Sequence, residues 1–548
     1  MDAFDCQKYI GTYAECKSGL SSGDNPRFMR QWYEPSYPKI AFNCHSQEEY
    51  LSSDRKYVPI TNGGGFRRWY GNLESIIDWS LRDSMHRPGY TKMHLYYIPG
   101  ICWNAISSGK LSCRYYGEGM LFEHAIASLF SRSNIKETFF LGYINSIVLQ
   151  SILKIMNPTL NNGAEVISSI PFFIPNNEKQ KLFIQDLVNS NISTSKSDWD
   201  AHETSWDFQA NELIRLANSS YQLLADVMES YKAVWTANFL KLHANEEELN
   251  RQFIEIYGLQ DELTPDVPLE EVTILQKGEI SIEDGEIVWH EDIVIKQLIS
   301  YLVGCYMGRY SIDKPGLIIA SQHQDLTTLG VKVEGVENGA EGRIEIDDDG
   351  MVPILAGEYF PDDMTVRIEQ AIKLIFGEEH FQANLRYIDE KLGKPLREYL
   401  FKDFFNDHID GKMYQKRPIY WMFSSKMGDK RKKGYFKALV YMHRIESDTL
   451  SKLHADYVVP YISKIEQQHI EAEDLSLRDD LSQAQRNRAR KSAEEYADQI
   501  RELKEFEQVL VQMASQRLSI DLDDGVRVNY PKFYPLVEPI KGLDKSDE

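Results

Sequence analysis

The sequence predicts an α+β protein built from several domains. Its 548 residues exceed what one hydrophobic core usually serves. The hydrophobic fraction of 42% and the charged fraction of 26% are ordinary for a folded globular protein. Near residue 176 the pattern changes from short apolar runs between Gly and Pro to long stretches with helical spacing. We therefore predict a mixed α/β domain followed by largely helical domains with a long C-terminal helix.

Changes in composition divide the chain into five predicted segments. They are an N-terminal connector (1–60), a candidate DNA target-recognition domain (61–175), a helical domain (176–330), an α+β domain with a basic-tipped hairpin (331–447), and a long helix with a C-terminal tail (448–548).

The segment 61–175 opens with a glycine-rich turn, residues 62–65, followed by two arginines set between aromatic rings. Short strands are expected between 90 and 125, because apolar and β-branched residues lie there between Gly and Pro. Residues 137–155 have the length and apolar spacing of one buried helix, which Pro158 ends.

The rest of the chain is predicted to be mostly helical. Apolar spacing predicts helices at 178–191, 211–242, 246–257 and 292–308, with a linker at 193–200. Residues 418–443 read as a β-hairpin, whose loop carries Lys430, Arg431, Lys432 and Lys433. That cluster is either a contact for a DNA backbone or a solvated hairpin tip. The last helix, 448–518, has near-heptad apolar spacing and is expected to pack on a partner helix, in this chain or another.

The net charge of −22 is unevenly distributed. Residues 1–175 hold 17 Lys+Arg against 15 Asp+Glu, whereas the remaining residues hold 44 against 68. A locally basic face can still bind DNA, with an affinity that depends on salt. The sequence has no secretory signal and no apolar run long enough for a membrane helix. Its six scattered cysteines fit reduced thiols in a cytoplasmic protein, not disulfides or zinc.

Catalytic motifs are missing from the sequence. It contains no phosphate-binding loop with the Gly-Lys-Ser/Thr ending and no Gly-x-Ser-x-Gly elbow. The nearest approach to the Asn-Pro-Pro-Tyr stretch of amino-group DNA methyltransferases is Asn157-Pro158-Thr159-Leu160, which lacks the aromatic residue that stacks on a flipped base. We expect no catalytic residue in this chain.

Two acidic patterns are candidates for metal sites. Asp362 with Asp389-Glu390-Lys391 resembles a Mg²⁺ nuclease, but residues 381–392 read as a helix and not as the strand such a site needs. Asp347-Asp348-Asp349-Gly350 lacks the spaced carboxylates of a calcium loop, so we expect a solvated turn. Neither predicts a bound metal, although a cryptic Mg²⁺-dependent nuclease stays a remote alternative.

Arginines, lysines and small polar residues in the first 175 residues are candidate DNA contacts, because cations position phosphates and bidentate side chains read base edges. Each candidate arginine could equally form a surface salt bridge, and the candidate tryptophan, Trp69, could belong to the core. The candidates are Lys17, Arg27, Arg30, Arg67, Arg68, Trp69, Asn104, Ser107, Ser108, Lys110 and Arg114.

Several motifs together resemble one known family over nearly the whole chain. They are Gly19-Leu20-Ser21-Ser22-Gly23-Asp24-Asn25-Pro26-Arg27-Phe28, Phe66-Arg67-Arg68-Trp69-Tyr70-Gly71-Asn72, Trp103-Asn104-Ala105-Ile106-Ser107-Ser108-Gly109-Lys110, Lys196-Ser197-Asp198-Trp199-Asp200, Glu203-Thr204-Ser205-Trp206-Asp207-Phe208 and Lys416-Arg417-Pro418-Ile419-Tyr420-Trp421. The sequence is similar to the non-catalytic C-terminal part of PglX, the adenine-specific DNA methyltransferase family of BREX phage-defence systems. The first three motifs also resemble target-recognition regions of type IIG restriction-modification enzymes and, more distantly, type I specificity subunits.

The resemblance implies recognition of double-stranded DNA for N6-adenine methylation. The family's methyl-donor and catalytic motifs precede such a region, so the chain is expected to be a fragment or to work with a separate methyltransferase catalytic domain or subunit. S-adenosylmethionine is expected on that catalytic part and not on this chain. Other phage-defence proteins are further expected partners. The alternative is a protein-interaction scaffold, in which the acidic C-terminal part binds defence components and DNA contact is incidental.

Overall fold

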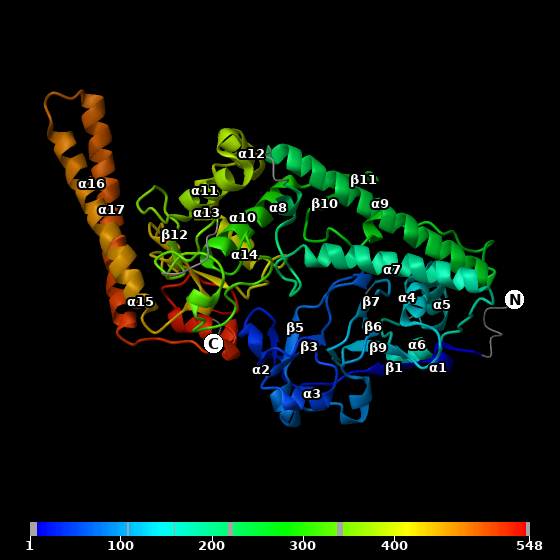
Figure 1. Ribbon diagram of the computed structural model, residues 1–548. Helices are drawn as coiled ribbons and strands as arrows, with labels where there is room; N and C mark the ends of the chain where they lie inside the picture. The colour runs from blue at the N-terminus through cyan, green and yellow to red at the C-terminus, as the bar shows by residue number, and fades with distance from the viewer. Residues whose placement is uncertain (1–7, 107–108, 158, 218–222, 337–342, 544–548) are drawn as a thin grey trace. The chain divides into compact units, whose positions relative to one another are not determined.

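The computed structural model describes residues 8–106, 109–157, 159–217, 223–336 and 343–543. The predicted α+β, multidomain class is confirmed (Figure 1). The chain forms two compact units. Unit 1 comprises Met1–Trp32, Tyr37–Phe208 and Glu229–His290, and unit 2 comprises Tyr33–Ser36, Gln209–Met228 and Glu291–Glu548. The predicted segment 61–175 lies in unit 1, whereas the predicted segment 176–330 is divided between the units.

Unit 1 contains two mixed β-sheets with a shared apolar core. The larger sheet has the order β1 (Ala14–Ser18), β9 (Ile126–Ser131), β6 (Gly100–Asn104), β7 (Cys113–Tyr116) and β4 (Trp69–Tyr70). Its strands are antiparallel except for β4 and β7, and Trp103 pairs with Cys113. The smaller sheet has the order β2 (Met29–Gln31), β5 (Ser75–Asp78), β3 (Tyr57–Thr61) and β8 (Leu121–Phe122). Strands thus form where Gly and Pro punctuate apolar runs, as predicted for residues 90–125.

Helices cover one side of the larger sheet. The longest are α7 (Glu178–Asp200) and α9 (Leu224–Tyr257). Residues 229–257 of α9 belong to unit 1. Figure 1 shows α7 beside α4 (Glu137–Asn145), and α7 also packs against the edge strand β4 of the sheet. The remaining helices of unit 1 are α1 (Ile10–Tyr13), α2 (Asn25–Phe28), α3 (Gln47–Ser52), α5 (Ile147–Met156) and α6 (Ala164–Ser168). A short hairpin, β10 (Ile280–Glu283) with β11 (Glu286–Trp289), completes the unit.

The single helix predicted over residues 137–155 is wrong. Two helices, α4 and α5, meet there at 69°. The bend is stabilised by local capping, because the hydroxyl of Ser146 accepts the N–H of Leu149 and the side chain of Asn250 accepts the N–H of Ile147. Among the described residues no single helix is long and apolar enough to cross a membrane. Helices α4 and α5 together have the length and apolar composition of such a span, but they are bent at 69°.

The predicted linker at 193–200 is also wrong, because α7 continues through it to Asp200. Its polar residues Ser195 and Asp198 are buried against other parts of unit 1 and do not face solvent. The helices predicted at 211–242 and 246–257 are corrected to α8 (Glu212–Leu216) and the continuous α9.

Unit 2 contains the predicted β-hairpin and many of the predicted helices. Strands β13 (Tyr420–Ser424) and β14 (Lys437–Tyr441) form that hairpin, and β12 (Met351–Pro353) pairs with β14. The helices of unit 2 besides α8 are α10 (Glu291–Met307), α11 (Met364–Phe376), α12 (Phe381–Leu392), α13 (Leu396–Lys402), α14 (Phe404–Ile409), α15 (Thr449–Lys452), α16 (Val459–Leu477), α17 (Gln483–Ala514) and α18 (Val526–Asn529).

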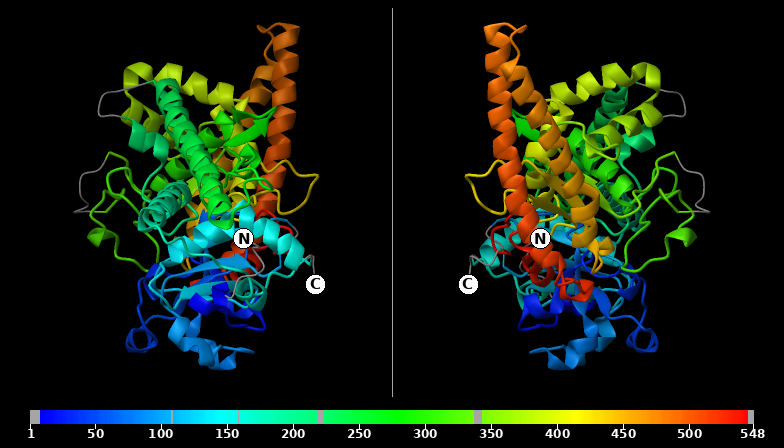
Figure 2. Two further views of the ribbon diagram at one scale, coloured as in Figure 1. Left: turned by 90° about the vertical axis from the view of Figure 1, so that its right-hand side faces the viewer. Right: turned by 90° about the vertical axis from the view of Figure 1, so that its left-hand side faces the viewer.

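The predicted long C-terminal helix is two helices that pack against each other. Helices α16 and α17 lie side by side along their length (Figure 2). The apolar residues Leu503, Phe506 and Leu510 of α17 are buried, as their heptad spacing predicts. The partner helix is therefore in the same chain, and the turn at residues 478–482 between the helices is not predicted by the apolar spacing.

Candidate nucleic-acid interface

Arg67 and Arg68 lie in a buried network of ion pairs in unit 1. The guanidinium of Arg67 donates to the carboxylate of Asp198 on α7 at 2.6 Å, and it lies over the Trp199 ring. Arg68 donates to Glu246 on α9 at 2.6 Å and to Glu271 at 2.8 Å. Only about a twentieth of either arginine is exposed. Both predicted contact residues are therefore structural in this conformation, because their guanidinium groups are buried and bonded to carboxylates of unit 1. The Nε of Arg68, which has no partner among the described residues, is shielded from solvent as well.

Trp69 belongs to the same network and to the core. Its indole N–H donates to the second oxygen of Glu246 at 2.6 Å, and its side chain is buried. Trp69 is predicted either to contact DNA or to belong to the core, and its burial is that of a core tryptophan. The network binds residues 66–70 to α7, α9 and the segment 271–276, and so it fixes the glycine-rich loop that precedes it.

That loop, residues 62–66, borders two adjoining cavities of unit 1, which we call the glycine-loop groove. One cavity, of about 750 Å³, is lined by Lys17, Gly63, Asn104, His124 and Asn161 among others. The other, of about 590 Å³, is lined by Gly64, Gly65, Phe66, Lys110 and Glu271 among others. Asn104 and Ile106 line both cavities.

The wall between the two cavities is built by the end of β6 and the turn after it. The indole of Trp103 donates to the carbonyl of Asn162 at 2.7 Å, and the N–H of Ala105 donates to the carbonyl of Ala125 at 3.0 Å. These bonds hold residues 104–106 between two other chain segments. Ile106 is 73% exposed there, an unusual position for a large apolar side chain.

Lys17, Asn104 and Lys110 are the predicted contacts that the groove brings together. Lys17 is half exposed and lies 3.7 Å from Glu15. Lys110 bonds to Glu271. Although burial works against it, Lys110 and Arg68 hold the pKa of Glu271 below its usual value. Ser107 and Ser108 lie outside the described residues.

Arg27, Arg30 and Arg114 are not on the groove wall. Arg27 is exposed on α2, and Arg30 donates to the carbonyls of Pro26 and Met29 at that helix's end. Arg114 is buried beneath the loop, and its Nη2 lies 3.4 Å from the carbonyl oxygen of Gly63. Burial raises the pKa of the neighbouring Cys102 and Cys113 thiols, although Arg114 opposes that rise, so both thiols stay neutral.

The basic loop of unit 2 is largely occupied by partners of its own. Arg431 pairs with Asp429 at 2.8 Å, and Lys432 pairs with Glu505 of α17 at 2.7 Å. Lys433 lies near the Tyr435 ring, and Lys430 is exposed. The loop backbone is anchored by the buried carboxylate of Glu502, which accepts N–H groups of residues 433, 434 and 435.

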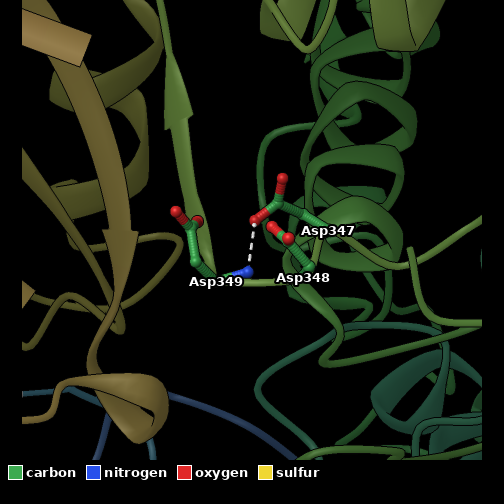
Figure 3. Close-up of side chains that lie close together, drawn as sticks. All are labelled: Asp347, Asp348 and Asp349. Carbon is green, nitrogen blue, oxygen red and sulfur yellow. Dashed lines mark hydrogen bonds between the residues drawn. The ribbon is translucent and has the colours of Figure 1, made fainter. Parts of the chain in front are cut away.

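The acidic patterns differ from the expected ones. Asp347 is buried and not solvated. Its carboxylate accepts the N–H group of Asp349 (Figure 3) and those of Gly350 and Met351. Burial, and then the nearby Asp349, raises the pKa of Asp347 well above its usual value, which opposes cation binding. In the described parts of the chain, one cluster of three possible metal-binding side chains is present. It consists of Asp347, Asp348 and Asp349, which have carboxylate oxygens within 4.8 Å of one another.

The residues of the nuclease-like pattern have separate partners. The carboxylate of Asp362 accepts the hydroxyl of Tyr457 at 2.8 Å, and Asp389 accepts the N–H of Leu396 at 2.7 Å. Lys391 lies 3.0 Å from Glu291. Residues 381–392 form the predicted helix, α12.

Sequence reasoning missed the carboxylates that hold the arginines. Asp198 lies on the segment predicted as a linker and Glu246 at the start of a predicted helix, and no element is predicted around Glu271. The signal available was the pair of adjacent arginines among aromatic residues, which implies buried counter-charges but does not say where they lie in the sequence.

No family model matches the chain. It is 31% identical over 541 residues to the adenine-specific methyltransferase PglX of Lacticaseibacillus casei (strain Zhang), covering 94% of this chain and 42% of that protein. It is 32% identical over 557 residues to the adenine-specific methyltransferase BrxX of Escherichia coli O9:H4 (strain HS), covering 97% and 43%. The chain is thus homologous to both proteins along nearly its whole length, which confirms the resemblance, and it spans less than half of theirs.

The solved structure of the type IIL restriction-modification enzyme MmeI in complex with DNA also aligns with the chain. The alignment has a TM-score of 0.28 and 12% identity, and it covers 47% of this chain and 34% of that one. A similarity of that size does not bear on the fold.

Proposed function

We propose that this chain recognises DNA sequence for N6-adenine methylation in a BREX-type phage-defence system. The homology to two adenine-specific methyltransferases supports a role connected with DNA. The observation that carries the proposal is the glycine-loop groove, where polar groups from several segments distant in the sequence line two adjoining cavities.

The groove offers the chemistry that base reading requires. Amide side chains such as Asn104 and Asn161 carry a donor and an acceptor together, and an amide of this kind can bond the amino group and ring nitrogen of adenine. The side-chain oxygen of Asn104 is shielded from solvent and has no hydrogen-bond partner within the described ranges, so a donor from DNA would relieve the cost of that burial. Lys17 adds a cation at the cavity wall.

Catalysis is assigned to another part of the assembly. A base must leave the duplex to be methylated on its exocyclic amine, and the pocket for it belongs to a methyltransferase catalytic domain or subunit that also holds S-adenosylmethionine. The groove residues do not resemble a methyl-donor site, so their role is to bind and orient DNA. Other defence proteins are proposed partners through the acidic remainder of the chain.

Selection from random DNA tests the proposal and identifies the recognised site in the same experiment. The chain is incubated with 30-base-pair duplexes that have a randomised centre, and the retained DNA is sequenced. We expect one enriched motif that contains adenine, together with weaker retention of that motif by Asn104→Ala. Asn487→Ala, on the exposed surface of α17, is the matched control and should behave like the unchanged chain.

Retention without any enriched motif would contradict sequence recognition. Failure to retain DNA at low salt, with intact binding to a partner protein, would favour the scaffold function.

A further inference from the structure

The glycine-rich loop has an unusual arrangement of backbone hydrogen bonds. Four successive carbonyl oxygens, from residues 63 to 66, each accept a side-chain donor. The pairs are Arg114 to Gly63 at 3.4 Å, Asn104 to Gly64 at 2.9 Å, Asn72 to Gly65 at 3.0 Å and Gln276 to Phe66 at 3.3 Å. Side chains thus fix every carbonyl of this segment in one orientation.

The N–H groups of the same segment are left free. In a planar trans peptide the N–H of each residue points away from the preceding carbonyl. The N–H groups of Gly64, Gly65 and Phe66 therefore point away from Arg114, Asn104 and Asn72. None of the three has a hydrogen-bond acceptor within the described residues, whereas the next N–H, of Arg67, lies 3.4 Å from the Ser112 hydroxyl. Successive free N–H groups form a concave site for anions.

The loop also leaves room for a ligand. A Cβ atom placed on Gly63 or Gly65 would meet no atom within 4 Å. Gly64 has a φ of +121°, which L side chains rarely adopt, so the exposed backbone depends on glycine there. Gly64, Gly65 and Phe66 line the cavity of about 590 Å³.

Arg114 supplies an uncompensated positive charge beneath the loop. It is 1% exposed, and no carboxylate in the described ranges lies within salt-bridge distance of it. Its Nε and Nη1 have no hydrogen-bond partner among the described residues, and the adjacent thiols are neutral. Burying an unpaired charge is costly, so an anion that binds nearby would relieve that cost.

We propose that the loop Gly63–Phe66, backed by Arg114, binds a phosphate group through its backbone N–H groups. In the proposed function, on which this inference rests, the ligand is a phosphodiester of the DNA backbone. Glu270 and Glu271 line the same cavity, and Glu271 is neutralised by Lys110 and Arg68. The remaining carboxylate favours a singly charged phosphodiester over a doubly charged phosphate monoester.

Neutralising single DNA phosphates tests the proposal. Duplexes that carry the motif enriched from random DNA are made with one methylphosphonate each, scanned along both strands. The unchanged chain should lose about tenfold in affinity at one or two positions, as expected when a charged acceptor is removed. Gly65→Pro, which removes one N–H group, should bind the unmodified duplex about tenfold more weakly and become insensitive at those positions.

Arg114→Met separates binding from folding. Removing a buried unpaired charge should raise the unfolding temperature of the free protein while DNA affinity falls. Arg431→Met, which removes an exposed cation of unit 2, is the matched control and should change neither. A lower unfolding temperature with unchanged DNA affinity would overturn the role of Arg114.

The source of the phosphate is resolved by glycine-selective NMR. Shifts of the Gly64 and Gly65 amide signals with the duplex, and not with inorganic phosphate, support the phosphodiester. Shifts with inorganic phosphate alone, in a protein that binds no DNA, would overturn the DNA assignment and the proposed function. DNA binding that is unaffected by Gly65→Pro and by every methylphosphonate would overturn the loop proposal and leave the proposed function standing.

Discussion

At the scale of single residues, the buried arginines of unit 1 differ in whether a carboxylate neutralises them. Arg67 and Arg68 are neutralised by Asp198, Glu246 and Glu271, whereas Arg114 has no carboxylate partner among the described residues. Breaking a buried pair leaves the remaining charge exposed to a low-dielectric interior, which costs far more than losing a surface pair. The first two therefore stabilise unit 1, whereas Arg114, which is 1% exposed, supplies positive charge beneath the glycine-rich loop in the proposed phosphate site.

Replacing Arg68 by Met should destabilise unit 1 by about 3–5 kcal/mol, because Glu246 loses its cation while it stays buried. The midpoint of chemical unfolding measures the change. Arg431→Met removes a pair whose arginine is 91% exposed, so its unfolding midpoint should stay close to that of the unchanged protein. Equal effects of the two variants would contradict the buried network.

Two buried histidines should make unit 2 sensitive to acid. Burial, and then the nearby Arg309, lowers the pKa of both His408 and His443 to about 3. Between pH 6.5 and 3 the unfolded chain binds a proton at each site and the folded chain does not, so stability falls as pH falls. Each histidine contributes up to about 1.4 kcal/mol per pH unit.

In His443→Gln one fewer proton is taken up on unfolding, so the stability of the variant should fall less steeply as pH falls. Unfolding midpoints of this variant and of the unchanged protein are compared at pH 7 and pH 5, where the difference between the two proteins should shrink at the lower pH. A difference independent of pH would mean that the pKa of His443 is the same in the folded and unfolded protein, and so is not lowered by burial.

The sequence was informative about residue types and less so about their roles. It singled out Arg67, Arg68 and Arg114 as candidate functional residues, because they lie beside aromatic residues and glycines. Their partners Asp198, Glu246 and Glu271 could not be identified, since a buried carboxylate reads as a solvated one until the tertiary fold places an arginine beside it. The free N–H groups of the glycine loop depend on side chains from four distant places and leave no local signal.

At the scale of elements, apolar periodicity predicted the strands and helices whose buried faces are apolar. The hairpin of β13 and β14 and the apolar face of α17 are examples. Periodicity failed where polar residues are buried, as in the last turns of α7, and where a cap bends a helix at Ser146. In both places tertiary hydrogen bonds replace the apolar contacts on which the pattern relies.

Glu502 should control the basic loop between β13 and β14. Its Oε1 accepts the N–H groups of Gly434 and Tyr435, each at 3.0 Å, and the hydroxyl of Ser425 at 2.6 Å. Glu502→Gln keeps one acceptor oxygen and replaces the other, so at least one of the N–H groups now bonded to Oε1 or Oε2 loses its acceptor and the charge that strengthens these bonds is lost. Amide exchange at residues 433–435 should therefore speed up at least about tenfold. Hydrogen exchange with mass spectrometry measures this.

Glu505→Gln is the control, because Glu505 lies on the same helix but forms a half-exposed pair with Lys432. Similar exchange in both variants would contradict anchoring by Glu502.

At the scale of the whole molecule, the two compact units group the chain differently from its composition. Helix α7 and residues 229–290 supply the carboxylates that hold the glycine loop, so unit 1 extends well beyond residue 175. A net charge of −22 also implies that DNA binding depends on few cationic contacts. The logarithm of the affinity should then fall with the logarithm of the salt concentration with a small slope, near one for each phosphate contact.

The titration of the unchanged chain against its selected duplex and a scrambled duplex, at two salt concentrations, tests DNA recognition most directly. We expect the selected duplex to bind at least about a thousandfold more tightly at physiological salt. That ratio should be largely kept when salt is raised, while both affinities weaken. Equal affinity for the two duplexes at both salt concentrations would mean that this chain does not read sequence.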